Sequence, residues 1–243
     1  MDPRLAVIDR RLEGIERILA VTGGKGGIGK SLVATTLAFG LAQDGRRAGL
    51  LDLDLTGPSD HVILGVKSRF PDEKFGVEPL DAGGVRFMST TCFAGDAPVP
   101  LRGADVTNAL LEILAITRWG SLDVLVIDMP PGLGDPLLDA IRLLRRAEHL
   151  AVATGSRVVL ETVRKNLSLL RRLDVPVVGV VENMARGPGG GVRHAAEAFA
   201  APYLGCVPWD EEVEAALGDP QRLVSTRAGA AIRAVGLKLL GAA

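Results

Sequence analysis

Cysteines, aromatic residues and net charge are all scarce in this sequence, and each shortage excludes a class of protein. The 243 residues include two cysteines, Cys92 and Cys206, with no CxxC pair, which excludes a disulfide-stapled secreted domain and a short-spaced metal cluster. Aromatic residues make up 4%, too few for a platform that stacks single-stranded nucleic acid. The formal net charge of −1 argues against a bulk nucleic-acid binder.

Long hydrophobic runs are missing as well. No apolar stretch approaches the roughly 18 residues that a membrane span requires. The N-terminus carries Asp2, Asp9 and Glu13 and lacks the apolar core of a signal peptide. We therefore expect a cytoplasmic protein with no nucleic-acid or membrane partner. Apolar residues make up 47% and glycines number 30, which favours a single domain with a sizeable core and glycine-rich loops.

Short apolar runs alternate with helical patterns through most of the chain. The expected strands cover residues 18–22, 48–52, 85–89, 124–128, 150–154, 177–182 and 203–207. The expected helices cover residues 31–43, 105–117, 135–146, 158–172, 193–200, 210–217 and 226–240. This alternation predicts an α/β fold with a doubly wound, mostly parallel sheet and helices on both faces, which binds ligands beyond the carboxyl ends of its strands.

Two segments stand outside this alternation. Leu5, Ile8, Leu12 and Ile15 recur at spacings of three and four, which predicts a leader helix over residues 4–17. Residues 66–84 are polar and rich in glycine and proline, so we expect a surface insertion there. The domain organisation that follows is a leader helix within residues 1–17 and one nucleotide-binding domain over residues 18–243.

The nucleotide assignment rests on a phosphate-binding loop. Residues 24–31 read GKGGIGKS, which matches G-x-x-x-x-G-K-[ST] between an expected strand and an expected helix. Glycines let backbone N–H groups converge on phosphate oxygens, and the helix N-terminus attracts the same charge. Lys30 is expected to pair with the β- and γ-phosphates and Ser31 Oγ to ligate Mg²⁺. The nucleotide-binding residues expected in the loop are Gly24, Lys25, Gly26, Gly27, Ile28, Gly29, Lys30 and Ser31.

Acidic residues follow two further expected strands. Asp52 and Asp54 follow the second strand, where one carboxylate can face the phosphates to orient a water or hold Mg²⁺. Asp128 ends the strand 124–128, which is the Walker B arrangement for a carboxylate that holds Mg²⁺. Gly132 lets a backbone N–H approach the γ-phosphate, and Asp135 either belongs to this switch or caps the next helix. Both segments are candidate nucleotide-sensing switches.

Together these motifs resemble one family of ATPases. The phosphate loop, DLDLTGPS, WGSLDVLVIDMPPGLGD and VVENM are similar to the Mrp/ApbC/Nbp group over roughly residues 15–240. These are iron–sulfur cluster carrier or assembly ATPases of the deviant Walker A, MinD/ParA class. The resemblance implies a slow Mg²⁺-dependent ATPase and a nucleotide-promoted homodimer in which Lys25 reaches the partner's nucleotide. It also implies that Asp54 is linked to hydrolysis, that Asn183 hydrogen-bonds the adenine and that Pro208 closes over the base.

The sequence departs from that family where the cluster should bind. Family members carry a CxxC shortly after the ENM motif, whereas residues 185–191 read ARGPGGG here. Leu133 stands where the family often has threonine, and no additional N-terminal domain is recognisable. Iron–sulfur clusters need thiolates, normally four, and Cys92 and Cys206 at strand ends are more typical of inert core. We therefore predict no stable cluster at the family's usual site, and expect a partner to hold any cluster or metal.

Three functions remain open at this point. The first is a nucleotide-dependent maturation factor that works with a metalloenzyme or a cluster-binding partner. The second is a positioning or partition ATPase like MinD or ParA, but the tail, residues 227–243, lacks a bulky aromatic membrane anchor. The third is an electron-transfer ATPase like the nitrogenase iron protein, which needs a cluster cysteine that residues 128–135 do not supply.

Overall fold

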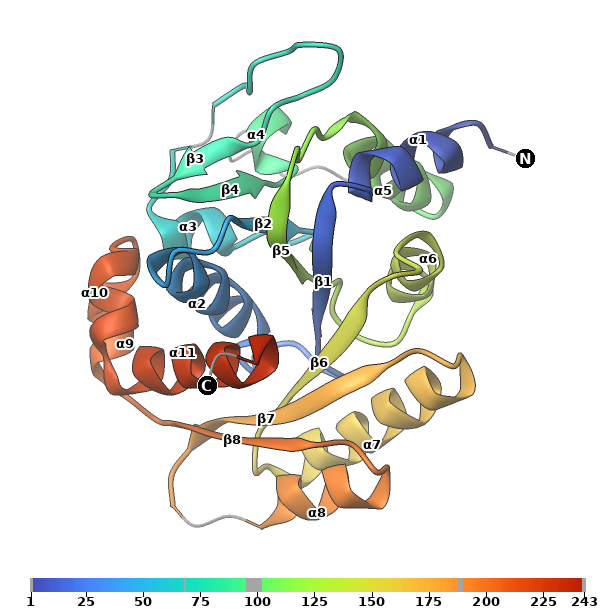
Figure 1. Cartoon of the computed structure of the whole chain (residues 1–243). Coiled ribbons are helices and arrows are strands. Elements are labelled where there is room, and N and C mark those ends of the chain that lie inside the picture. The colour runs from blue at the N-terminus through green and yellow to red at the C-terminus, as the bar shows by residue number, and fades with distance from the viewer. Residues whose placement is uncertain (1, 68, 95–101, 188–189, 242–243) are drawn as a thin grey trace.

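The fold is a twisted sheet between two layers of helices (Figure 1). The computed structural model describes residues 2–67, 69–94, 102–187 and 190–241. The eight strands lie in the order β3-β4-β2-β5-β1-β6-β7-β8, and every pair is parallel except β3 with β4. The strands are β1 (Ile15–Thr22), β2 (Ala48–Asp52), β3 (Leu80–Ala82), β4 (Val85–Met88), β5 (Leu122–Asp128), β6 (Glu148–Ala153), β7 (Val177–Ala185) and β8 (Tyr203–Pro208). The predicted doubly wound α/β fold is confirmed.

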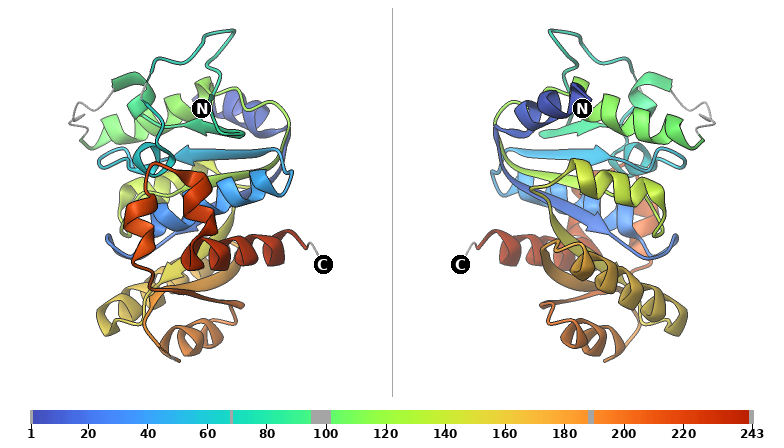
Figure 2. Two further views of the ribbon diagram at one scale, coloured as in Figure 1. Left: turned by 90° about the vertical axis from the view of Figure 1, so that its left-hand side faces the viewer. Right: turned by 90° about the vertical axis from the view of Figure 1, so that its right-hand side faces the viewer.

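Helices cover both faces of the sheet, as the two side views make plain (Figure 2). One face carries α2 (Lys30–Gln43), α3 (Asp60–Leu64), α9 (Glu212–Ala216), α10 (Pro220–Ser225) and α11 (Arg227–Leu240). The other carries α1 (Arg4–Leu12), α5 (Ala104–Ile116), α6 (Asp135–Leu143), α7 (Arg157–Arg172) and α8 (Gly191–Ala198). The short helix α4 (Thr91–Ala94) follows β4. Within the described parts of the chain, no helix is long and apolar enough to cross a bilayer.

The central strands lack polar alternation because both of their faces are covered. Residues 19–21 of β1 and 124–127 of β5 are completely buried, as expected for parallel strands between two helical layers. Val21 and Asp52 each lie beside Asp128 in the sheet register. The carboxyl ends of β1, β2 and β5 therefore meet, and the loops that follow these strands build one site.

The predicted leader helix is too long. Helix α1 ends at Leu12, and Ile15 already belongs to β1, where it pairs with Leu122 and is fully buried. Gly14 lies between the two elements, and a Cβ there would approach the carbonyl oxygen of Gly120 to 2.8 Å. The chain must leave the helix to pass this close contact, so residues 15–17 are strand rather than helix.

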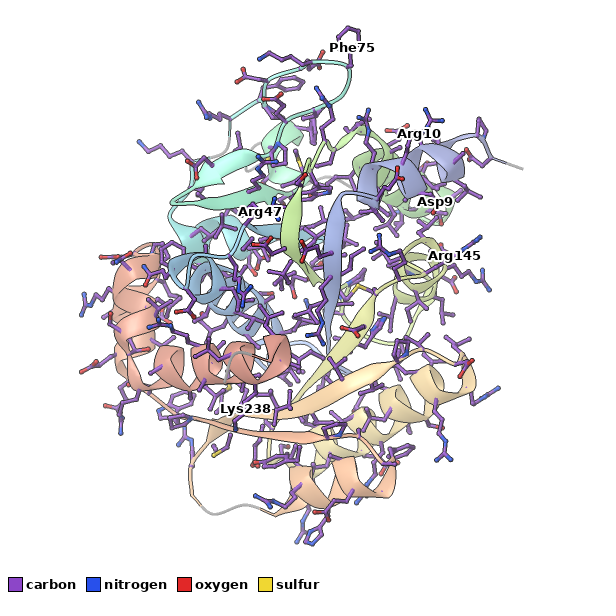
Figure 3. All side chains as sticks on the ribbon, in the orientation of Figure 1. Asp9, Arg10, Arg47, Phe75, Arg145 and Lys238 are labelled. Carbon is purple, nitrogen blue, oxygen red and sulfur yellow. The ribbon has the colours of Figure 1, made fainter. Side chains whose placement is uncertain are left out.

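The predicted surface insertion over residues 66–84 is also only partly correct. Its last residues form β3, which pairs antiparallel with β4 and buries Leu80 and Ala82. Val77 is buried as well, so the segment returns to the core. The sequence analysis missed β3 because it is three residues long, and missed α3, α4 and α10 for the same reason of length. Phe75, at 98% exposure, marks the tip of the truly exposed part (Figure 3).

Candidate functional site

The phosphate-binding loop connects β1 to α2 at the meeting point of the strand ends. Gly27 and Gly29 have φ of 78° and 77°, a left-handed backbone that favours glycine. A Cβ on Gly29 would approach Asn183 Nδ2 to 2.3 Å, so only glycine fits there. Helix α2 has neither an acidic first turn nor a side-chain cap among the described residues. Its first backbone N–H groups are thus available to an anion.

Asp128 accepts hydrogen bonds from the two loop side chains that are expected to bind the phosphates and Mg²⁺. Lys30 Nζ donates to Asp128 Oδ1 at 2.5 Å, and Ser31 Oγ donates to Asp128 Oδ2 at 2.6 Å. Lys30 and Asp128 are buried, at 7% and 0% exposure. Burial raises the pKa of Asp128, while Lys30 and Ser31 hold it down. The ammonium of Lys30 is therefore already at the floor of the loop, where a phosphate would compete with Asp128 for it.

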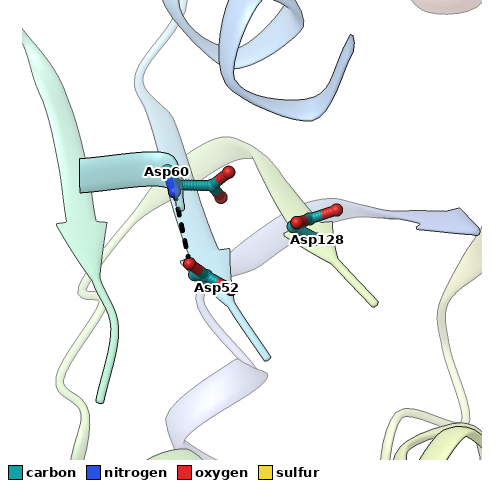
Figure 4. Close-up of side chains that lie close together, drawn as sticks. All are labelled: Asp52, Asp60 and Asp128. Atoms are coloured by element: carbon teal, nitrogen blue, oxygen red, sulfur yellow. Dashed lines mark hydrogen bonds between the residues drawn. The ribbon is translucent and has the colours of Figure 1, made fainter. Parts of the chain in front are cut away.

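Asp128 is also one of three clustered carboxylates (Figure 4). Oxygens of Asp52, Asp60 and Asp128 all lie within 4.8 Å of one another, and all three side chains are fully buried. Asp52 accepts hydrogen bonds from the backbone N–H groups of Asp54, Ser59 and Asp60 at 3.0, 3.2 and 3.4 Å. Burial raises the pKa of Asp52 to about 7, and the charge of Asp128 adds to the rise.

Asp60 has the least compensated charge of the three. Neither of its oxygens accepts a hydrogen bond of ordinary geometry from the described residues, although the Thr35 hydroxyl lies close enough to lower its pKa. Burial, followed by the charges of Asp52 and Asp128, raises the pKa of Asp60 well above its usual value. Asp60 was not predicted as a site residue because its burial comes from tertiary packing, which leaves no local signal in the sequence.

These donors fit Mg²⁺. Carboxylate and hydroxyl oxygens are the ligands that this hard cation takes, and the two buried oxygens of Asp60 without a hydrogen-bond partner leave acceptors for a cation and its waters. Ser31 and Asp128 would hold the ion, with Asp52 and Asp60 behind them.

Asp54 lies apart from this cluster. Its Oδ1 accepts hydrogen bonds from its own turn, namely the N–H and Oγ1 of Thr56 at 3.3 and 3.0 Å and the N–H of Gly57 at 3.0 Å. The side chain is partly exposed and lines the cavity above the phosphate loop. Its roles in hydrolysis and in metal binding stay predictions.

The cavity above the loop is large enough for a nucleotide. Its volume is about 740 Å³, and its lining includes Lys25, Lys30 and Ser31 of the phosphate loop together with Trp209 and Leu217. Trp209 follows Pro208, the half-buried residue that ends β8. The indole is 42% exposed, and the Arg186 guanidinium lies 4.3 Å from its ring centroid. Sequence reasoning named Pro208 here but not the aromatic ring beside it.

Asn183 and the second switch also border the loop or the cavity. Asn183 is buried, and its Nδ2 donates to the Ile28 carbonyl at 2.9 Å. The amide thus braces the phosphate loop, and its expected contact with adenine stays a prediction. Gly132 has φ of 83° in the loop after β5. Asp135 is exposed at the start of α6 and makes no capping hydrogen bond to the described residues, so the capping alternative for Asp135 is wrong.

The cysteines do not form a cluster site within the chain. Cys92 is buried in α4, and burial raises the pKa of its thiol, as expected for inert core. Cys206 is exposed on β8, so its assignment to the core was wrong: β8 is an edge strand. Strands β4 and β8 stand six positions apart in the sheet, on the order of 29 Å, so Cys92 and Cys206 cannot ligate one cluster together. Pro188 and Gly189 of the predicted glycine–proline loop lie outside the described residues.

Comparisons with known proteins agree with this geometry. The sequence model of the ParA family described as NUBPL iron-transfer P-loop NTPase matches residues 14–239. The iron–sulfur cluster carrier protein of Pseudomonas fragi is 38% identical over 220 residues, which are 83% of this chain and 76% of that protein. The chain spans 60% of the length of the Aquifex aeolicus carrier protein, at 37% identity over 84% of this chain.

Solved structures show the same fold. A nucleotide-binding protein from Archaeoglobus fulgidus, in complex with ADP, has a TM-score of 0.75 at 27% identity, over 90% of this chain and 92% of that one. The cell division ATPase MinD of Pyrococcus furiosus shares the fold, with a TM-score of 0.70 at 21% identity over 94% of this chain and all of its own. From the phosphate loop, the sheet order and these matches together, the chain belongs to the ParA/NUBPL family of iron-transfer P-loop NTPases.

Proposed function

We propose that this protein is a Mg²⁺-dependent, ATP-hydrolysing dimeric switch that acts in iron–sulfur cluster or metalloenzyme maturation. The observation that carries the proposal is the convergence of Lys30 and Ser31 on Asp128 at the floor of a nucleotide-sized cavity. Family membership supports this interpretation over a positioning ATPase or an electron-transfer ATPase. Because the chain spans only part of some relatives, the activity and the partners are proposals for this chain.

Each residue of the loop has a part in nucleotide binding. Lys30 exchanges the carboxylate of Asp128 for the β- and γ-phosphates, since both are anionic acceptors in reach of one buried ammonium. Ser31 and Asp128 would hold Mg²⁺, which would supply positive charge to the phosphates. Asp54, at the cavity wall, orients the attacking water. Because such a carboxylate acts mainly in the transition state, its loss lowers turnover more than binding.

Hydrolysis is tested by phosphate release under Mg²⁺ and ATP. Asp54→Ala should bind ATP with an affinity near that of wild type and release phosphate at least tenfold more slowly. Asp9→Ala, at an exposed carboxylate on α1, is the matched control and should turn over normally. Full turnover by Asp54→Ala would assign the water to another acid, with Asp52 or Asp135 as the next candidates.

The dimer is proposed from Lys25. This lysine is exposed at the mouth of the cavity, where it can reach a second copy of the chain. Lys25→Ala should retain ATP binding and lose both turnover and ATP-induced dimerisation in light scattering. A wild-type protein that stays monomeric with a non-hydrolysable ATP analogue would contradict the dimeric switch.

We propose that a partner protein, rather than this chain, holds the iron–sulfur cluster. Within one chain the two thiols are too far apart to share a cluster, so a homodimer offers at most two equivalent thiolates at any one site. Anaerobic reconstitution with iron and sulfide should leave no stable [4Fe–4S] cluster on the isolated protein. About four irons per dimer with an absorbance band lost in Cys206→Ser, but kept in Cys92→Ser, would return the chain to the cluster carriers.

A further inference from the structure

Positive charge is concentrated on α7. The helix carries one acid, Glu161, against five exposed cations, although the whole chain has a net charge of −1. The five are Arg157, Arg164, Lys165, Arg171 and Arg172. Among the described residues, the only ion pair of these cations joins Arg164 to Glu161 at 3.9 Å, with both side chains more than half exposed. Such an exposed pair stabilises the fold little, so the positive charge of α7 is available to a negatively charged ligand.

Three of these cations surround a groove of about 440 Å³. Arg164, Lys165 and Arg172 line it together with Ser168 and Leu169 of α7. The opposite wall is Leu133, from the loop between β5 and α6. Residues 165, 169 and 172 recur at spacings of four and three and therefore share one face of the helix. The groove thus combines an apolar pair, Leu133 and Leu169, with a cationic rim.

The wall of this groove is continuous with the nucleotide site. Pro131 lines the nucleotide cavity, and Leu133, two residues later, lines the α7 groove. Gly132 between them has φ of 83°, a conformation that glycine adopts without strain. A shift of this short loop on nucleotide exchange would move Leu133 relative to α7.

We propose that the α7 groove docks an acidic segment of a partner protein, one that also presents an apolar side chain, and that the bound nucleotide sets its affinity. The nucleotide dependence of this docking rests on the proposed function, whereas the docking itself does not. The leucine pair favours a protein segment over nucleic acid, because a phosphate backbone offers nothing apolar to cover it. Residues 164–172 span about 12 Å along the helix axis, which suits about two helical turns or four extended residues of a partner.

The docking is tested with a fluorescein-labelled peptide of 14 residues composed of glutamate and leucine, followed by anisotropy. The triple reversal Arg164→Glu/Lys165→Glu/Arg172→Glu should weaken binding roughly thirtyfold or more, since three charge-assisted contacts become repulsive. The control Lys67→Glu/Lys74→Glu/Arg222→Glu changes net charge equally at exposed cations outside α7 and should bind within about threefold of wild type. Equal binding by both triple variants would overturn the site.

Two further arms separate the alternatives. A 20-base-pair DNA duplex that binds more tightly than the peptide, and is lost in the groove variant alone, would reassign the groove to nucleic acid and overturn the proposal. In wild type, ADP and a non-hydrolysable ATP analogue should give peptide affinities that differ by about fivefold or more. Equal affinities, with calorimetry proving that both nucleotides bind, would overturn the regulation. Absence of nucleotide binding would instead count against the proposed function, while the two triple variants would still decide the docking.

Discussion

Relative to wild type, the Asp52→Asn variant should become more stable as the pH rises. The folded-state pKa of Asp52 is about 7, and the unfolded chain titrates near the ordinary value of 3.8. The folded state therefore binds more protons over this range, so the free energy of unfolding of wild type falls as the pH rises from about 4 through 7. Asparagine cannot ionise, so the variant escapes this loss.

The magnitude follows from those two pKa values. At about 1.36 kcal/mol per pKa unit, the penalty for ionising Asp52 in the folded state grows by about 2.7 kcal/mol between pH 5 and pH 8.5. The amide keeps one acceptor and turns its NH₂ toward the N–H groups of Ser59 or Asp60, at a cost of roughly 1–3 kcal/mol that does not depend on pH. The stability of the variant relative to wild type should thus improve by about 2.7 kcal/mol over the interval.

Urea unfolding followed by circular dichroism at four pH values, with EDTA and without nucleotide, measures this difference. Titrating groups away from the carboxylate cluster, such as buried His149, are common to both proteins and cancel in the comparison, whereas Asp60 and Asp128 interact with Asp52 and belong to the measured difference. If the difference between Asp52→Asn and wild type stayed flat over this range, the prediction would be refuted, because Asp52 would then be ionised in the folded protein at every pH tested.

Three further outcomes are expected. Trp209 is exposed and Trp119 fully buried, so in a Trp119→Phe background ATP should change the remaining fluorescence. Trp209→Ala should weaken ATP binding by about 5- to 160-fold, since stacking of a base contributes about 1–3 kcal/mol. Unchanged affinity in calorimetry would place the base elsewhere. Burial lowers the pKa of His149 to about 4. The free energy of unfolding of wild type should therefore fall by up to about 3 kcal/mol as the pH falls from 6.5 to 4. The His149→Leu variant should lack that loss when the two proteins are compared in acid unfolding. Removal of Mg²⁺ by EDTA should weaken ATP binding at least tenfold in wild type, and no change would mean that the carboxylate cluster holds no ion.

The order of strands and helices was predictable because burial on both faces leaves a direct trace in the sequence. Residues 124–127 and 177–181 are continuous apolar runs, and the structure has β5 and β7 over them. The phosphate loop was predictable for a similar reason, since its glycines and Lys30 satisfy a local spacing rule. The predicted end of the leader helix was wrong, because a local pattern carries no information on tertiary contacts. Ile15 continues the periodicity of α1 but belongs to β1, where it pairs with Leu122.

Features of the site that depend on packing left little trace in the sequence. Asp60 is chemically ordinary until α3 buries it beside Asp52 and Asp128. Cys206 lies in an apolar run yet is exposed, because β8 is the sheet edge. The pairing of Arg186 with Trp209 joins residues 23 positions apart, on different loops. Burial and long-range contact of this kind follow from the fold rather than from spacing along the chain.

Calorimetric titration of Mg²⁺–ATP into wild type and Lys30→Ala tests the central claim most directly. The account predicts one ATP per chain for wild type and an affinity at least about 100-fold lower for Lys30→Ala, because the variant loses the buried ammonium that the phosphates would take from Asp128. Lys67→Ala, at an exposed lysine, is the control and should bind as wild type does. An unchanged affinity in a folded Lys30→Ala protein would contradict the assignment of the loop as the nucleotide site.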